Sequence, residues 1–144
     1  MQRIIVRDFG PIREADVELG KFNIFIGEPA SGKSTLAKLV YFFKSLKEEV
    51  KEFVLYSNES MVRINTVILH KFSLYFGSSL NLSEDFVVEY YYNDVDFIKL
   101  QRSPLLHVNI ADDFFSRIKN YLHPLFEKKN HPLYSRVIMD SAEV

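Results

Sequence analysis

One short stretch organises this chain of 144 residues: Gly27-Glu28-Pro29-Ala30-Ser31-Gly32-Lys33-Ser34. It matches the pattern G-x-x-x-x-G-K-[ST] at every fixed position. The chemistry behind the pattern is anion binding, because the glycines let the backbone wrap its N–H groups around a phosphate and the following helix adds the positive end of its dipole. The stretch therefore predicts a phosphate-binding loop that joins a strand to a helix.

The polar side chains that follow the second glycine have distinct expected roles. Lys33 supplies a cation to the β- and γ-phosphates, and the hydroxyl of Ser34 completes the coordination of a Mg²⁺ ion that also holds phosphate oxygens. The expected ligand is a nucleoside triphosphate with Mg²⁺, and a guanine-specific switch is disfavoured because the guanine-reading motif N-K-x-D is absent from the chain. Ser34 is the expected metal ligand, and the predicted nucleotide-binding residues are Gly27, Glu28, Pro29, Ala30, Ser31, Gly32, Lys33, Ser34 and Thr35.

The residues on either side of the loop show the periodicities that such a loop requires. Residues 22–26 form a short, nearly continuous apolar run, which predicts a central parallel strand buried on both faces. A long amphipathic helix is expected over residues 33–52, because apolar residues recur there at helical spacing: Leu36, Leu39, Val40, Phe43, Leu46 and Val50. A chance match to the pattern is disfavoured, because the strand before the loop and the helix after it are predicted from residues outside the pattern's fixed positions.

The middle of the chain predicts a β-hairpin. Residues 86–92 and 95–101 are rich in aromatic and β-branched side chains, and the pair Asn93-Asp94 between them tolerates positive φ. A two-residue turn at this pair would place Tyr90 opposite Phe97.

The remaining residues complete an α/β fold. A helix is expected between Asn58 as N-cap and Gly77 as C-cap, and another over residues 111–129, where Pro124 would kink or interrupt it. Further strands are expected at residues 3–6, 14–19 and 106–110. The predicted fold class is the nucleotide-binding lobe of a P-loop NTPase, with a central strand, an antiparallel side sheet and flanking helices. No linker or internal repeat divides the chain, so residues 1–144 are expected to form a single domain.

Composition narrows the function classes. The chain is 47% hydrophobic and 26% charged, which is typical of a globular domain with a sizeable core. Its 18 Lys and Arg against 19 Asp and Glu give a net charge of −1, so a protein that coats DNA through a general basic surface is not expected. The absence of cysteine excludes disulfides and thiolate chemistry and is compatible with the cytoplasm. No apolar run is long enough to predict a membrane span.

The first third of the chain has a distinctive order of segments. They are Ile4-Ile5-Val6-Arg7-Asp8-Phe9-Gly10-Pro11-Ile12, the acidic alternating strand, Phe22-Asn23-Ile24-Phe25-Ile26-Gly27, the loop, and Thr35-Leu36-Ala37-Lys38-Leu39. This order closely resembles the N-terminal lobe of ABC-type ATPases of the SMC, RecF and OLD (overcoming-lysogenization-defect) group, over residues 1 to about 45. The resemblance implies an ATPase that uses ATP and whose heads dimerise over two nucleotides, commonly in DNA repair, chromosome handling or phage defence.

The resemblance also nominates three residues outside the loop. Asp140, which ends an apolar run, is a candidate for the family's Walker B aspartate, although Ser141 follows where a glutamate is expected. Gln101 is a candidate for the residue that touches Mg²⁺ and the attacking water, and Phe9 for an aromatic against the adenine. Each candidate also has a plainer interpretation: Asp140 would simply end a strand, Gln101 would be a glutamine on an edge strand, and Phe9 would be part of the hydrophobic core. The family's signature segment, its D-loop and its switch histidine have no convincing counterpart in the chain.

Three functional hypotheses follow. The favoured one is the N-terminal part of an SMC/OLD-like ATPase, which binds ATP–Mg²⁺. To hydrolyse ATP it needs a C-terminal lobe or a partner head, for example in a homodimer, so the isolated chain is expected to be inactive. In this hypothesis the chain contacts DNA only indirectly. The alternatives are a complete small P-loop kinase and a non-enzymatic module that senses nucleotide.

Overall fold

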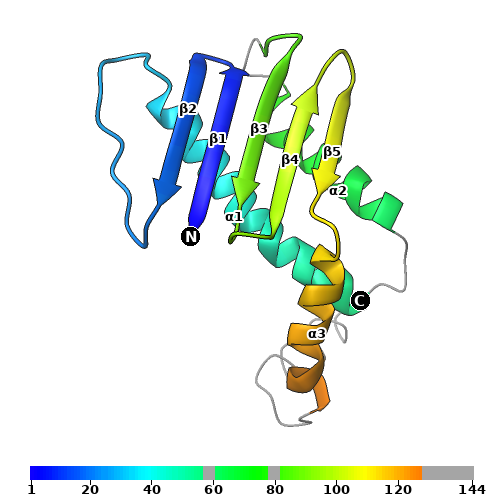
Figure 1. The fold of residues 1–144 in the computed structure, drawn as a ribbon. Helices are drawn as coiled ribbons and strands as arrows, with labels where there is room; N and C mark the ends of the chain where they lie inside the picture. The colour runs from blue at the N-terminus through cyan, green and yellow to red at the C-terminus, as the bar shows by residue number, and fades with distance from the viewer. Residues whose placement is uncertain (57–60, 78–81, 128–144) are drawn as a thin grey trace, which may run out of the picture.

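The structure is a computed structural model that describes residues 1–56, 61–77 and 82–127. Within these ranges the chain forms five strands and three helices (Figure 1). In chain order they are β1 (Gln2–Phe9), β2 (Ile12–Leu19), α1 (Lys33–Tyr56), α2 (Met61–Phe76), β3 (Phe86–Tyr91), β4 (Phe97–Arg102), β5 (Leu106–Ile110) and α3 (Phe114–Glu127).

The five strands form one antiparallel sheet in the order β2-β1-β3-β4-β5, with α1 and α2 behind one of its faces (Figure 1). Every second residue of a strand faces this helical layer, as the two-residue period of a strand requires. The residues with no exposed surface on the three central strands are Ile4, Val6 and Phe9 of β1, Val88 and Tyr90 of β3, and Ile98 and Leu100 of β4. The core therefore lies between the sheet and the helices.

The opposite face of the sheet carries charged cross-strand neighbours. Arg3 of β1 donates from Nε to Oδ1 of Asp16 on β2 at 2.6 Å, and this hydrogen bond lowers the pKa of Asp16. Lys99 of β4 and Glu89 of β3 lie 3.2 Å apart. Glu89 and Lys99 are directly paired and Arg3 and Asp16 are diagonal neighbours, and opposite charges at such positions support the register and leave this face polar.

Aromatic rings fill much of the core. Phe9 at the end of β1 is fully buried and meets Phe72 and Phe76 of α2 and Phe86 of β3 edge-on, with ring centroids 6.0, 5.3 and 5.1 Å away. Edge-to-face contacts of this kind add to the free energy gained by burial. Phe9 therefore ties the sheet to α2.

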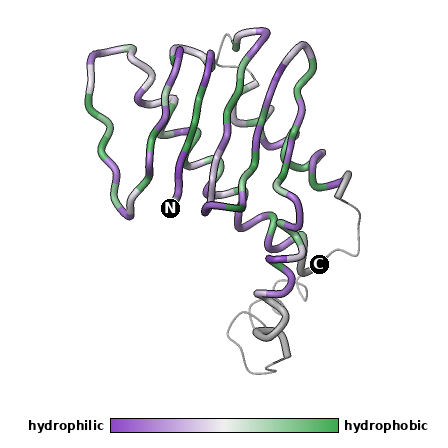
Figure 2. Tube along the Cα trace, viewed as in Figure 1, coloured by the Kyte–Doolittle hydropathy of each residue, from purple (hydrophilic) through white to green (hydrophobic). Residues whose placement is uncertain are grey.

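The prediction of a central parallel strand at residues 22–26 is wrong. These residues run as an irregular extended segment outside the sheet, and Figure 2 shows their apolar run in the loop between β2 and α1. Phe22, Ile24 and Ile26 are 82%, 68% and 89% exposed. The physical reason is pairing: a doubly buried strand needs neighbours on both sides, and no described strand pairs with this segment.

The hairpin forms, but the predicted register is off by one residue. Tyr90 pairs with Ile98, and Phe97 pairs with Tyr91. The cause is Asn93, whose side-chain oxygen accepts hydrogen bonds from the backbone N–H groups of Val95 and Asp96 at 2.8 and 2.7 Å. This side-chain bridge makes the turn one residue longer than the two-residue form.

The helices agree with the sequence pattern. α1 begins at Lys33 as expected and extends to Tyr56, and α2 ends before Gly77, whose N–H donates to the carbonyl of Ser73 at 2.7 Å. Pro124 was expected to kink or interrupt the last helix; α3 continues through it to Glu127, so the interruption is wrong, and the kink stays a prediction. The expected N-cap Asn58 lies outside the described residues.

Truncating the buried ring at the centre of the aromatic cluster tests this packing. Phe9→Ala should lower the free energy of unfolding by about 3–5 kcal/mol, because it removes a fully buried ring and leaves a cavity. Phe22→Ala is the matched control and should change stability by less than about 0.5 kcal/mol, because that ring is largely exposed already. Urea unfolding followed by circular dichroism measures both, and equal losses in the two variants would contradict the packing described above.

Candidate phosphate-binding site

The loop of residues 27–34 leads directly into α1, and its backbone leaves donors available at the helix start. The first helical hydrogen bond runs from the N–H of Leu36 to the carbonyl of Gly32 at 2.8 Å. The N–H groups of Lys33, Ser34 and Thr35 make no backbone hydrogen bond with a described residue. These groups carry the positive end of a 24-residue helix, which is an arrangement that binds anions.

The loop wraps around the head group of its own lysine. Nζ of Lys33 donates to the carbonyl oxygen of Gly27 at 2.7 Å, to that of Glu28, and to the hydroxyl oxygen of Ser31 at 3.1 Å. The ammonium group thus sits at the centre of the loop and holds it in a closed curve. The positive charge and the free backbone donors therefore belong to the same short junction between the loop and α1.

Two loop residues have a left-handed backbone, Ala30 with φ of 59° and Gly32 with φ of 90°. A Cβ atom on Gly32 would lie 2.6 Å from Cγ1 of Ile12, at the start of β2, so only glycine fits there. A Cβ atom on Gly27 would meet nothing closer than the hydroxyl oxygen of Ser31 at 3.4 Å, which is an ordinary contact. The two glycines of the motif therefore have unequal structural roles.

A hollow of about 300 Å³ lies beside the loop, between β2 and the extended segment before it. Its walls are mostly apolar, and it is also lined by Lys33, Ser31 and Glu14 of β2. The sequence marks Glu14 only as part of the expected strand at residues 14–19. Its position beside the loop depends on where Gly32 contacts β2, for which the sequence carries no signal.

The structure brings together the predicted loop residues but not the residues nominated outside the loop. Phe9 has no exposed surface and lies in the core, as the plainer alternative held, so its ring offers no face to an adenine. Gln101 lies on β4 with its neighbours Ile98 and Leu100 facing the core, and it lines a hollow of about 200 Å³ that includes no loop residue. Asp140 lies outside the described residues.

The loop fits a nucleotide phosphate with a bound magnesium ion. Ser34 is exposed at the first turn of α1, where its hydroxyl group can serve as a metal ligand. Elsewhere in the described ranges, no three His, Asp or Glu side chains gather into a metal-binding group.

None of the described helices is long and apolar enough to cross a membrane.

Comparison with known proteins gives one match. The model of the family described as AAA ATPase domain matches residues 1–142, a span that includes the loop and every described element. No curated protein and no solved structure matches the chain.

The unequal roles of the two glycines can be tested by adding one methyl group to each. Gly32→Ala should lower the melting temperature by roughly 5–10 °C, because it forces an alanine into a left-handed conformation and against Ile12. Gly27→Ala should shift it by less than about 2 °C, since its contacts are ordinary. Differential scanning calorimetry gives both values, and a Gly32→Ala protein as stable as the parent would refute the close approach to β2.

Proposed function

The chain belongs to the AAA ATPase domain family, and from this premise we propose that it binds ATP and Mg²⁺ through residues 27–35. The observation that carries the proposal is the geometry of the loop: it folds around the ammonium group of Lys33 and leads directly into N–H groups at the start of α1 that make no backbone hydrogen bond with a described residue. Both features favour a dense negative charge such as a triphosphate.

Each residue of the site has a part in this binding. Lys33 exchanges a contact with a loop carbonyl for one with a phosphate oxygen, and the first-turn N–H groups, from Lys33 to Thr35, donate to the phosphates. Ser34 would hold the magnesium ion through its hydroxyl group. The metal supplies charge neutralisation on the phosphate oxygens when it is bound. These parts position the triphosphate, and orienting the attacking water is a separate task.

We further propose that the ATPase is of the SMC/RecF/OLD type, acts in the cytoplasm, and serves DNA repair or phage defence. The support is the sequence order of strand, turn, acidic strand, apolar run and loop over the first 45 residues or so. In this hypothesis the chain works with a C-terminal lobe or a second head, which includes a homodimer. The exposed side chains of Phe22, Ile24 and Ile26 fit such an assembly, because they form an apolar strip beside the site.

Removing the ammonium group tests nucleotide binding. Lys33→Ala should weaken the binding of ATP–Mg²⁺ by roughly 10- to 100-fold, the value expected for losing a charge-assisted hydrogen bond to phosphate. Lys38→Ala is the matched control on the same helix, since its ammonium group lies over the ring of Phe76 at 5.2 Å rather than in the loop. Isothermal titration calorimetry measures both affinities. Parent-like affinity in Lys33→Ala would overturn the proposal.

Turnover by the 144 residues alone distinguishes the functional hypotheses. We expect hydrolysis on the order of 10⁻³ s⁻¹ or slower, because the loop positions phosphates and a second lobe or partner is needed to stabilise the transition state. A phosphate-release assay with Lys33→Ala as the contaminant control measures the rate. Robust turnover that disappears in Lys33→Ala would favour a self-sufficient ATPase, and phosphate transfer to a small acceptor would favour a kinase. Binding without turnover, even when a partner is supplied, would favour a nucleotide sensor.

A further inference from the structure

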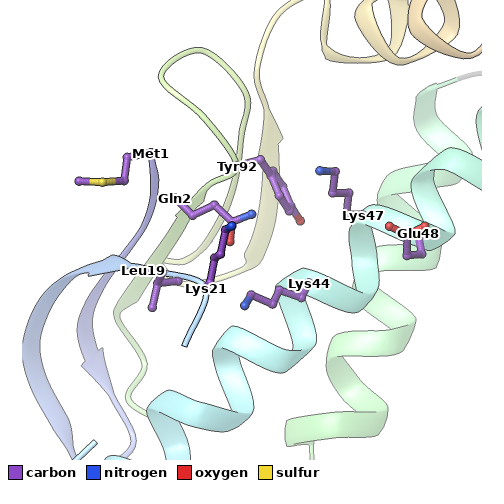
Figure 3. Close-up of a pocket in the computed structure, with 9 residues that line it drawn as sticks. Met1, Gln2, Leu19, Lys21, Lys44, Lys47, Glu48 and Tyr92 are labelled. Carbon is purple, nitrogen blue, oxygen red and sulfur yellow. The ribbon is translucent and has the colours of Figure 1, made fainter. Parts of the chain in front are cut away.

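A second basic site lies at the other end of the sheet from the phosphate loop. A hollow of about 540 Å³ opens where β1 begins and β2 ends, against the middle of α1 (Figures 1 and 3). It is lined by Lys21, which follows β2, and by Lys44 and Lys47 of α1. Lys44 lies 11 residues into the helix, or about 16 Å along its axis, so this hollow is separate from the loop.

The lysines of this hollow have no carboxylate partner among the described residues. Glu48 also lines it, but its carboxylate pairs with Lys51 at 2.7 Å. The N-terminal amino group pairs with Asp94 at 3.2 Å. Lys21, Lys44 and Lys47 therefore contribute positive charge to one concave volume without local compensation, and such a cluster attracts a multiply charged anion.

Several contacts hold the walls of the hollow in place. Tyr92 is buried, and its hydroxyl group donates to the carbonyl of Phe43 at 2.6 Å, while the ammonium group of Lys47 lies 6.0 Å from the centre of its ring. Gly20 and Asn23 form two reciprocal hydrogen bonds, of 2.9 and 3.1 Å, around Lys21. The lysines thus project from a fixed turn and from a packed helix.

Gln2 adds a neutral donor to the same volume. Its side-chain oxygen accepts a hydrogen bond from the hydroxyl group of Tyr90 at 3.0 Å, which fixes the orientation of the amide group. The amide nitrogen has no partner among the described residues, and Gln2 lines the same hollow as Lys21 (Figure 3). Proteins commonly bind phosphate oxygens with ammonium groups and oriented N–H donors of this kind.

The adjoining hollow differs in charge. It shares Lys47 and Tyr92 with the first and has a volume of about 420 Å³. Its other cations are compensated, Lys51 by Glu48 and Arg117 by Asp96, which accepts from Nε of Arg117 at 2.7 Å. The uncompensated charge is therefore concentrated around Lys21 and Lys44.

We propose that the hollow between Lys21, Lys44 and Lys47 is a second anion site, which binds an oligophosphate group independently of the phosphate loop. The phosphates belong either to a free oligophosphate or to the backbone of a single-stranded nucleic acid. Both sources offer closely spaced negative charges to the same lysines.

Residue-resolved NMR titration with inorganic pyrophosphate separates the two sites in one sample. Amide resonances of Gly20, Lys21, Lys44 and Lys47 should shift in the parent protein and equally in Lys33→Ala. Lys44→Gln and Lys47→Gln should each weaken the titration of the Gly20 and Lys21 resonances by at least about fivefold. Lys38→Gln, a loss of the same charge from the same helix, should weaken it by less than about twofold.

A second titration with a 15-residue oligothymidylate identifies the source. If the oligonucleotide binds more tightly than pyrophosphate, and Lys44→Gln and Lys47→Gln lose this binding, the ligand is the backbone of a nucleic acid. If pyrophosphate binds more tightly than the oligonucleotide, the ligand is a free oligophosphate. The proposal is overturned if neither probe shifts the Gly20 and Lys21 resonances, or if Lys38→Gln weakens the titration as much as Lys44→Gln does. Because Lys33→Ala retains this site, failure of ATP binding at the loop and failure of the second site are distinguishable.

Discussion

The contact between the backbone of Gly32 and the side chain of Ile12 is the constraint on which the rest of the structure depends. It fastens the start of α1 to the first residue of β2, and it is possible only because Gly32 has no side chain and adopts a left-handed backbone. From this point α1 runs behind the sheet, and its apolar face covers the central strands (Figure 1). The ammonium group of Lys33 closes the loop next to this contact, so the core and the anion site meet at one short stretch of chain.

The structural features that the sequence predicted correctly are mainly those determined by residues close together in the chain. The loop and the start of α1 depend on neighbouring residues, and the pattern from Gly27 to Ser34 contains them all. The segment at 22–26 failed because a buried strand is defined by its neighbours, which hydrophobicity alone does not supply. The register of the hairpin failed because two hydrogen bonds to one side chain, that of Asn93, added a residue to the turn.

The candidate sites divide in the same way. Lys33 and Ser34 are readable from the motif, whereas the position of Glu14 beside the loop depends on how β2 meets Gly32. The spacing of Lys44 and Lys47 places them on one face of a helix, but only the fold brings Lys21 to the same hollow. Phe9 shows the converse, since the family resemblance nominated it for a contact with the adenine and packing places it in the core.

The extended segment before the loop has a consequence for how the protein is made in a cell. Its apolar side chains alternate along a backbone that no described strand pairs with, so a nascent chain displays the features by which edge strands adhere to one another. Chaperones that hold exposed apolar segments would recognise the strip formed by Phe22, Ile24 and Ile26. Any contact that covers this strip would therefore reduce the tendency of the polypeptide to self-associate.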